Sequence, residues 1–198
     1  MKLRSSATSP FVRKVRMTAI ECGVELDLVP TNAWAPDTDL VHENPLSKVP
    51  TLVLGNGETL FDSPVICEYL DTLHSGHKLF PHEPNERFRQ LRLQALADGI
   101  LDAALHIRVE SSTRPADKRW DGWVERQQAA IARSLDTLEK DVGHWGGVFL
   151  IGPISVVSAL GYLDFRKVCD WRQSRPHLAH WYTTTHNRRS VRETEPVE

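Results

Sequence analysis

The pattern of apolar residues changes once along this chain, near residue 80, and that change constrains the fold more than any other feature. Before it, short strand-like runs (KLRS, ELDLV, VPTLVL and ETLF) alternate with helical ones. The stretch HSGHKLFPHEPNE, rich in Gly, Pro and polar residues, is typical of a linker. After it, apolar residues recur at helical spacings of three and four. We therefore expect an α/β domain over residues 1–80 and an all-α domain over 86–198.

Two helices of the first domain are expected to begin at Ser-Pro pairs. Ser9-Pro10 precedes a run of apolar residues at helical spacing, and Ser63-Pro64 precedes another. Serine is a preferred N-cap, and proline is favoured at the first helical position because its missing N–H has no partner there anyway. Gly23 is a natural residue to end the first helix. With a hairpin at GNG, the order β-α-β, an irregular segment, then β-β-α predicts a small sheet with helices on its faces.

Composition and charge exclude several classes of function. The chain carries 24 Lys and Arg against 26 Asp and Glu, so nothing indicates a nucleic-acid or acidic-membrane partner. No apolar run approaches the roughly 20 residues that span a bilayer, and mixed sequence follows Met1 in place of a signal-peptide core. Cys22, Cys67 and Cys169 are too few and too scattered for a disulfide framework or a zinc site, and the histidines lack ligand spacing. We expect a cytoplasmic protein without a metal site.

Three local motifs carry a resemblance to a known family. They are TSPFVRKV at the first helix, NPLSKVPTL entering the hairpin, and DSPVICEYLD at the next helix. In this order and spacing the chain resembles the glutathione S-transferase family over nearly its whole length, and ALADGILDAAL and LGYLDFR are similar to a bacterial serine-type subgroup. The resemblance implies a thioredoxin-like domain that binds glutathione, followed by an all-helical domain, usually in a homodimer.

The resemblance also implies a catalytic residue. The thiolate of glutathione is the nucleophile, and a hydrogen-bond donor at a helix N-terminus lowers the pKa of the thiol. Family members use a Tyr, Ser or Cys near the start of the first helix. Here the first tyrosine is Tyr69, Cys22 lies near the far end of that helix, and Ser9 occupies the serine-type position. Ser9 can also be only an N-cap, although one hydroxyl can accept from a helix N–H while donating to sulfur. The other candidate donors are Thr8, Ser6 and Ser5.

The remaining motifs imply the glutathione-binding residues. In the family the proline corresponding to Pro50 is cis, and the residue before it, here Val49, offers its backbone to the cysteinyl part of glutathione as an added strand. Lys48 is placed to reach a glutathione carboxylate, or is a solvated lysine. Asp62 is a candidate partner of the γ-glutamyl ammonium and Ser63 of its carboxylate, at a helix N-terminus that favours anions. Alternatively, these two residues only cap the helix.

The function implied is attack of the glutathione thiolate on a hydrophobic electrophilic small molecule. The alternatives are a glutathione-dependent disulfide reductase and a non-catalytic interaction module. Trp34 and the helix over 104–108 are reasonable walls for the second substrate. In several classes an acid from the partner subunit also helps, and Asp98 and Asp102 are possible. The cations Arg13, Lys14 and Arg16 suit an anionic ligand, or are simply exposed.

One departure from the family concerns stability. The family's buried C-terminal helix starts with a hydroxyl residue and, three residues later, an Asp that together form a capping box. Aligned on GYLDF, these positions hold Leu150 and Pro153. We expect Pro153 at the first helical position, with Gly152 as a weak cap. The loss is expected to cost about 1 kcal/mol, so that restoring Ser-x-x-Asp raises the thermal midpoint.

Overall fold

A four-stranded sheet forms the first layer of the molecule. The computed structural model describes residues 1–197. Its strands are β1 Lys2–Ser5, β2 Asp27–Pro30, β3 Thr51–Val53 and β4 Thr59–Leu60. They lie in the order β2-β1-β3-β4, with β1 parallel to β2 and antiparallel to β3, and β3 antiparallel to β4. The mixed sheet and its right-handed parallel unit match the expected thioredoxin-like architecture.

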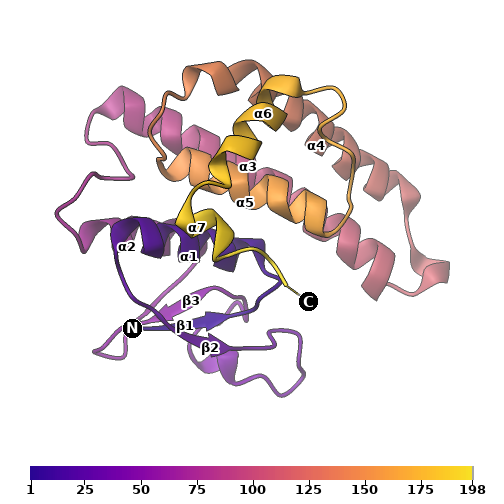
Figure 1. Cartoon of the computed structure of the whole chain (residues 1–198). Helices are drawn as coiled ribbons and strands as arrows, with labels where there is room; N and C mark the ends of the chain where they lie inside the picture. Colours follow the sequence, from indigo (N-terminus) through magenta and orange to yellow (C-terminus); the bar gives the residue numbers. More distant parts are fainter. Residues whose placement is uncertain (198) are drawn as a thin grey trace.

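Two helices, α1 (Pro10–Cys22) and α2 (Ser63–Thr72), cover one face of this sheet (Figure 1). Ser9 is the N-cap of α1, and Gly23 ends it in the left-handed conformation with φ of 66°, as predicted. The second Ser-Pro pair behaves differently. Asp62 is the N-cap of α2 and makes no side-chain cap bond, so that Ser63 is already the first helical residue. The buried Leu40 of the short helix η1 (Asp39–His42) belongs to the segment between β2 and β3.

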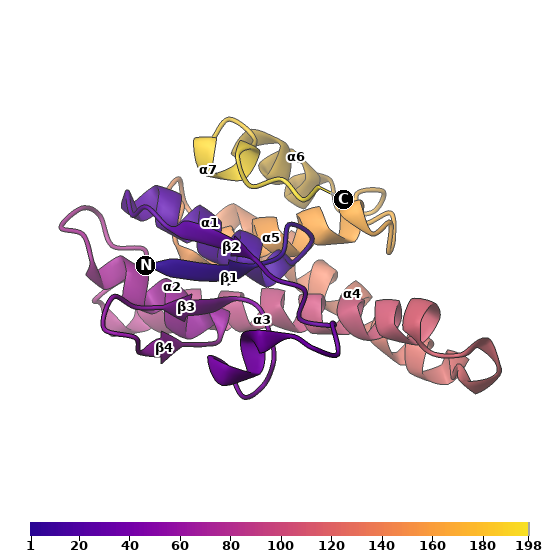
Figure 2. The same ribbon diagram turned by 90° about the horizontal axis from the view of Figure 1, so that it is seen from below.

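The second half of the chain is helical, as expected. Its longer helices are α3 Pro84–Arg108, α4 Asp121–Asp141, α5 Ile151–Phe165 and α6 Pro176–Thr185. Shorter ones are η2 Val109–Thr113, η3 Ala116–Lys118, η4 Val142–His144 and α7 Arg189–Arg192. Every residue of α5 from Ile151 to Leu163 is buried, because this helix packs against α3 and α1 at once. Figures 1 and 2 show α3 and α4 projecting together beyond the rest of the molecule.

The buried face of α3 differs in part from the apolar stripe that the sequence predicted. Phe88 is 68% exposed and Ala95 is also exposed, whereas Leu93 and Ala97 are buried. The reason is that α3 packs against both α4 and α5, which bury a wider and differently centred face than a single stripe.

The start of α5 also differs from expectation. The helix begins at Ile151 with Leu150 as N-cap, so Pro153 is its third residue, not its first. The backbone N–H of Ile151 donates to the carbonyl of Leu79 over 3.2 Å. The N–H of Gly152 donates to the side chain of Gln90 on α3. The first turn is therefore capped by groups far away in the sequence.

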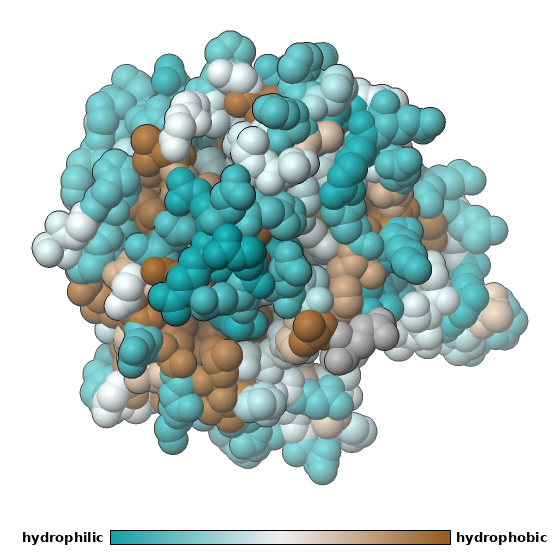
Figure 3. All heavy atoms as spheres, in the orientation of Figure 1, coloured by the Kyte–Doolittle hydropathy of each residue, from teal (hydrophilic) through white to brown (hydrophobic). Residues whose placement is uncertain are grey.

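Polar and apolar residues divide the visible surface. On the face of Figure 3 the region over α7 is hydrophilic, whereas apolar residues gather over β2, the edge strand that carries the exposed Leu28. Among the helices of residues 1–197, none is both long and apolar enough to cross a membrane.

Candidate functional site

Ser9 lies between the end of β1 and the first residue of α1. Its backbone is extended, with φ of −80° and ψ of 121°, and its Oγ accepts a hydrogen bond from the N–H of Val12 over 3.3 Å. The backbone N–H of Ser9 is held by the carbonyl of Ser6 at 3.1 Å. No acceptor for the hydroxyl proton of Ser9 is found within residues 1–197. The hydroxyl can therefore cap the helix and still donate to a ligand atom.

The neighbouring hydroxyls bond to other groups of the chain, and Ser6 and Thr8 share a single hydrogen bond. Ser5 is buried and donates to the carbonyl of Val29 over 3.4 Å. The hydroxyls of Ser6 and Thr8 lie 3.3 Å apart and form a pair. Of the four candidates, Ser9 is the one that lies at the N-terminus of α1, where the helix dipole favours a negative charge.

The segment before β3 presents a backbone edge. Its Val49–Pro50 peptide bond is cis, as the resemblance implied. Lys48 is exposed, Val49 is half-buried and Pro50 is buried. The carbonyl of Lys48 accepts hydrogen bonds from Asn44 and Thr51, two buried residues that the sequence analysis did not single out. Asn44 is the first residue of the NPLSKVPTL motif, and its place in that motif is the sequence feature that could have pointed to it.

The start of α2 carries the other predicted pair. Asp62 is exposed, whereas the side chain of Ser63 is only 1% exposed. Since Asp62 makes no cap bond, the first N–H groups of α2 have no side-chain partner from that residue. A helix N-terminus in this state can bind a carboxylate.

An ion pair between the buried Lys14 of α1 and the partly buried Asp98 of α3 joins the two halves of the molecule. The ammonium of Lys14, 0% exposed, donates to both carboxylate oxygens of Asp98 over 2.7 and 2.8 Å. Burial raises the pKa of the Asp98 carboxyl, Lys14 opposes that rise, and the charges of Asp102 and Asp62 add to it. Asp98 is thus engaged within its own chain, while Asp102 remains exposed.

The other two cations of α1 hold the C-terminal tail. Arg13 is buried, and its Nη2 donates to the carbonyl of Val191 over 3.3 Å. Nη2 of Arg16 donates to the carbonyl of Glu193 over 3.0 Å. For Arg13 and Lys14 both expectations were wrong, because these two side chains are buried and bonded within the chain, whereas Arg16 is half-buried.

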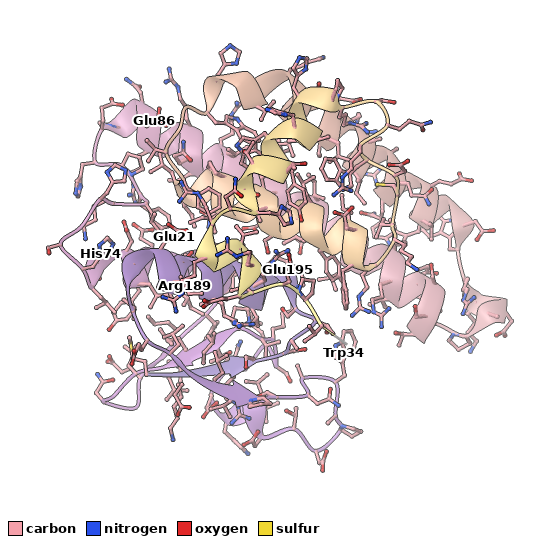
Figure 4. The ribbon with its side chains drawn as sticks, in the orientation of Figure 1. Glu21, Trp34, His74, Glu86, Arg189 and Glu195 are labelled. Carbon is pink, nitrogen blue, oxygen red and sulfur yellow. The ribbon has the colours of Figure 1, made fainter. Side chains whose placement is uncertain are left out.

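Trp34 lies at the edge of this region. It is 73% exposed, on the irregular segment after β2. Figure 4 shows it beyond the part of the tail that carries Glu195, at the opposite side of the molecule from His74. In the helix segment 104–108, Ala104 is buried and Arg108 is exposed, so this end of α3 offers both apolar and charged surface.

The cysteines do not have the properties of nucleophiles. Burial, together with the charge of Asp71, raises the pKa of Cys22 to about 12, and burial raises that of Cys67 to about 11. Near neutral pH both therefore stay protonated, and a thiol is a far weaker nucleophile than a thiolate. Cys169 is exposed, although partial burial of its thiol also raises the pKa of that group.

One group of potential metal ligands lies at the other end of the helices. Single donor atoms of Cys22, Asp71 and His74 lie within 4.8 Å of one another. The Nδ1 atom of His74 accepts from the N–H of Gly76, which leaves the proton on Nε2, 2.9 Å from the Asp71 carboxylate. In this arrangement Nε2 donates to Asp71, so the His74 and Asp71 side chains are hydrogen-bonded to each other.

Comparisons with known proteins decide the family. Residues 8–73 match the glutathione S-transferase N-terminal domain, and residues 121–184 match the C-terminal domain. The chain belongs to the glutathione S-transferase family. It is 38% identical over 200 residues to the uncharacterized GST-like protein YibF of Escherichia coli K12, covering 99% of this chain and 98% of that protein. The family assignment thus rests on both halves of the chain.

Two solved structures are similar over the whole chain. A family member from Pseudomonas fluorescens Pf-5, crystallised with bound glutathione, is 42% identical with a TM-score of 0.94, covering 100% of this chain and 99% of that one. A glutathione S-transferase from Methylobacillus flagellatus KT, with glutathione bound, is 36% identical with a TM-score of 0.94, covering 99% of each chain. The glutathione S-transferase fold, a thioredoxin-like domain followed by an all-helical one, is therefore confirmed for this chain.

Proposed function

We propose that this protein is a glutathione transferase that activates the thiol of glutathione for attack on hydrophobic electrophilic small molecules. The observation that carries the proposal is the position of Ser9, whose hydroxyl caps α1 and keeps its proton available for a sulfur atom. A hydrogen bond to the thiolate and the dipole of α1 both favour the charged form of the thiol. No general base is needed, since the thiol proton can leave to water once its pKa is low. The sulfur then forms the bond to the electrophile, and the leaving group departs with its electron pair.

The peptide part of glutathione is assigned to three neighbouring segments. Val49 and Pro50 offer their backbone edge to the cysteinyl unit as an added strand. Lys48, exposed beside them, pairs with a carboxylate of glutathione. The free N-terminus of α2, with Ser63, holds the γ-glutamyl carboxylate, and Asp62 holds its ammonium. The proposal is supported by the bound glutathione in the two similar structures.

The deciding measurement is the thiol pKa of bound glutathione, read from thiolate absorbance, in the wild type and in Ser9→Ala. We expect a lowered thiol pKa in the wild type and a loss of most of that lowering in Ser9→Ala, which still binds glutathione. Thr8→Val is the matched control, because it removes a neighbouring hydroxyl that is paired with Ser6. A wild type that binds glutathione without lowering its thiol pKa contradicts the proposal.

The chemistry of the second substrate is tested separately. Purified protein is given glutathione with a chlorinated aromatic electrophile, and then with a mixed disulfide of glutathione. We expect turnover with the electrophile. Turnover only with the disulfide identifies a reductase instead, in which the glutathione thiolate attacks the glutathione sulfur of the mixed disulfide, forms glutathione disulfide and releases the other thiol. Failure to bind glutathione at all favours a non-catalytic interaction module.

We also propose that the protein works in the cytoplasm as a homodimer. Four exposed positions along α3, at spacings of seven, four and three residues, include a large apolar residue and two small ones, which suit close packing against a second copy. These positions are Phe88, Ala95, Gly99 and Asp102. Sedimentation equilibrium should give twice the chain mass, and Phe88→Asp should give the monomer with its helix content unchanged. A monomeric wild type contradicts the dimer.

A further inference from the structure

Asn44 joins the two ends of the segment that leads into β3. It is only 1% exposed, and every polar atom of its side chain is used. Its Nδ2 donates to the carbonyl of Lys48 and to the hydroxyl of Thr51, each over 3.0 Å. Its Oδ1 accepts from the N–H of Leu46, also over 3.0 Å. The hydroxyl of Thr51 donates in turn to the same Lys48 carbonyl over 2.9 Å.

Two buried donors therefore point the Lys48 carbonyl inward. The Lys48–Val49 peptide bond is trans, so its N–H points away from its carbonyl across the peptide plane. Holding the carbonyl against Asn44 and Thr51 turns the N–H of Val49 in the opposite direction, outward. Within the described part of the chain, that N–H has no hydrogen-bond partner. The direction of a donor on the surface is thus determined by an amide beneath it.

We propose that Asn44, assisted by Thr51, is a positioning residue for glutathione, which acts by orienting the backbone N–H of Val49 toward the cysteinyl unit. This role rests on the proposed function, since Val49 is the strand-like edge of that site. Asn44 is too deeply buried to touch the ligand itself. It removes the need for the segment to order itself when glutathione binds, and such preorganisation appears as tighter binding.

The chemistry of an amide is required at position 44. Its NH₂ group supplies both donors, whereas its oxygen satisfies the N–H of Leu46. Asn44→Asp keeps the shape and that acceptor but places a carboxylate oxygen against the Lys48 carbonyl, and two acceptors repel. Thr51→Val likewise keeps the shape and removes the second donor, while Thr51→Ser retains it.

The test is calorimetric titration with glutathione, together with the thiol pKa of the bound form. We expect the glutathione Kd to rise about tenfold or more in Asn44→Asp and several-fold in Thr51→Val, because each change removes two hydrogen bonds of the network that holds the Lys48 carbonyl. Thr51→Ser should bind like the wild type. In every variant the thiol pKa of the bound glutathione should equal that of the wild type, because Ser9 is untouched. Should Asn44→Asp fail to fold, the Thr51 pair decides the question.

Gln90→Leu is the control for a merely structural effect. Gln90 is another buried amide with hydrogen bonds, but it lies on α3 and caps α5. Even where Gln90→Leu lowers the thermal midpoint as much as Asn44→Asp does, Gln90→Leu should leave the glutathione Kd unchanged. An unchanged Kd in Asn44→Asp, or an equal rise in Gln90→Leu, overturns the positioning role alone. A wild type that does not bind glutathione overturns the proposed function, and the positioning role falls with it.

Discussion

Gln90 on α3 accepts a hydrogen bond from the backbone N–H of Gly152, in the first turn of α5, over 3.1 Å. The other end of the same amide donates to Glu86 over 2.7 Å, so the side chain is anchored at both ends. An N–H in the first turn of a helix usually donates its hydrogen bond to the side chain of a nearby serine, threonine or aspartate. Here the cap comes from a different helix, which makes the start of α5 dependent on its packing against α3.

We expect Gln90→Leu to lower the free energy of unfolding by about 1–3 kcal/mol, because it leaves the buried N–H of Gly152 without a partner. In a chain of this size that corresponds to a fall of roughly 2–12 °C in Tm. Gln94→Leu is the matched control. Gln94 lies one turn further along α3, is equally buried, and its Nε2 has no partner within the described residues. Its replacement should be neutral or stabilising, and an equal loss in both variants contradicts the capping role.

Restoring the capping box is now expected to destabilise the protein, contrary to the expectation from the sequence. Leu150 is buried, and the N–H groups of Ile151 and Gly152 already have partners. Leu150→Ser with Pro153→Asp removes a buried leucine side chain, worth about 2–3 kcal/mol, which exceeds the gain of about 1 kcal/mol from an N-cap. We expect a lower thermal midpoint in the double variant. A rise in calorimetric Tm would show that the missing box costs stability after all.

The two roles of Ser9 can be separated by substitution. Aspartate is as good an N-cap as serine, whereas alanine loses about 1 kcal/mol of stability. We therefore expect Ser9→Asp to unfold like the wild type and Ser9→Ala to be less stable. For bound glutathione, however, Ser9→Asp should raise the thiol pKa above the value in Ser9→Ala, since it adds a negative charge beside the sulfur. Thermal unfolding measures the capping role, and thiolate absorbance measures the effect on the thiol pKa. A low thiol pKa in Ser9→Asp contradicts the proposed hydrogen bond from Ser9 to the sulfur.

The Lys14–Asp98 pair should be sensitive to removal of one partner. Lys14→Met leaves the partly buried carboxylate of Asp98 without its partner, and we expect a loss of up to about 3 kcal/mol at neutral pH, the lower limit for a fully buried pair. The double variant Lys14→Met with Asp98→Leu should recover most of it. Chemical denaturation of the four proteins gives the coupling energy, and independent, additive losses would contradict a direct interaction.

The pH dependence of Lys14→Met has a definite sign. Burial holds the pKa of Asp98 above its ordinary value of 3.8, and loss of Lys14 raises it further. A carboxyl whose pKa is raised in the folded state destabilises that state as pH rises from the unfolded pKa through the folded one. The deficit of Lys14→Met should therefore shrink as pH falls through the raised pKa of Asp98 toward 3.8, because the carboxyl of the folded variant becomes protonated in that range. A deficit that is constant from neutral pH to that region contradicts the pKa shift.

The cysteines should differ in reactivity. Burial raises the pKa of Cys22 to about 12 and of Cys67 to about 11, whereas Cys169 is exposed. A disulfide reagent at mildly alkaline pH should modify one thiol per native chain and all three in denaturant. Cys169→Ser should abolish the native reaction. Rapid modification of Cys22 or Cys67 in the folded protein contradicts their burial.

Features that depend on neighbours in the sequence were predictable from the residues. Ser9 caps the helix that follows it, Gly23 ends that helix, and the backbone of both is set within a few residues. The change from alternating strands and helices to helices alone predicted a first half with a sheet and an all-helical second half. The motifs around Ser9, Pro50 and Ser63 predicted the family, and the comparisons confirmed it.

Features that depend on partners distant in the sequence were decided only by the tertiary structure. Asp98, 84 residues after Lys14, turned an apparently exposed cation into a buried ion pair. Gln90, 62 residues before Gly152, replaced the missing capping box. Arg13 reaches the carbonyl of Val191, 178 residues away. A buried polar group must find a partner somewhere, and local pattern shows that need without showing which distant group packing brings to it.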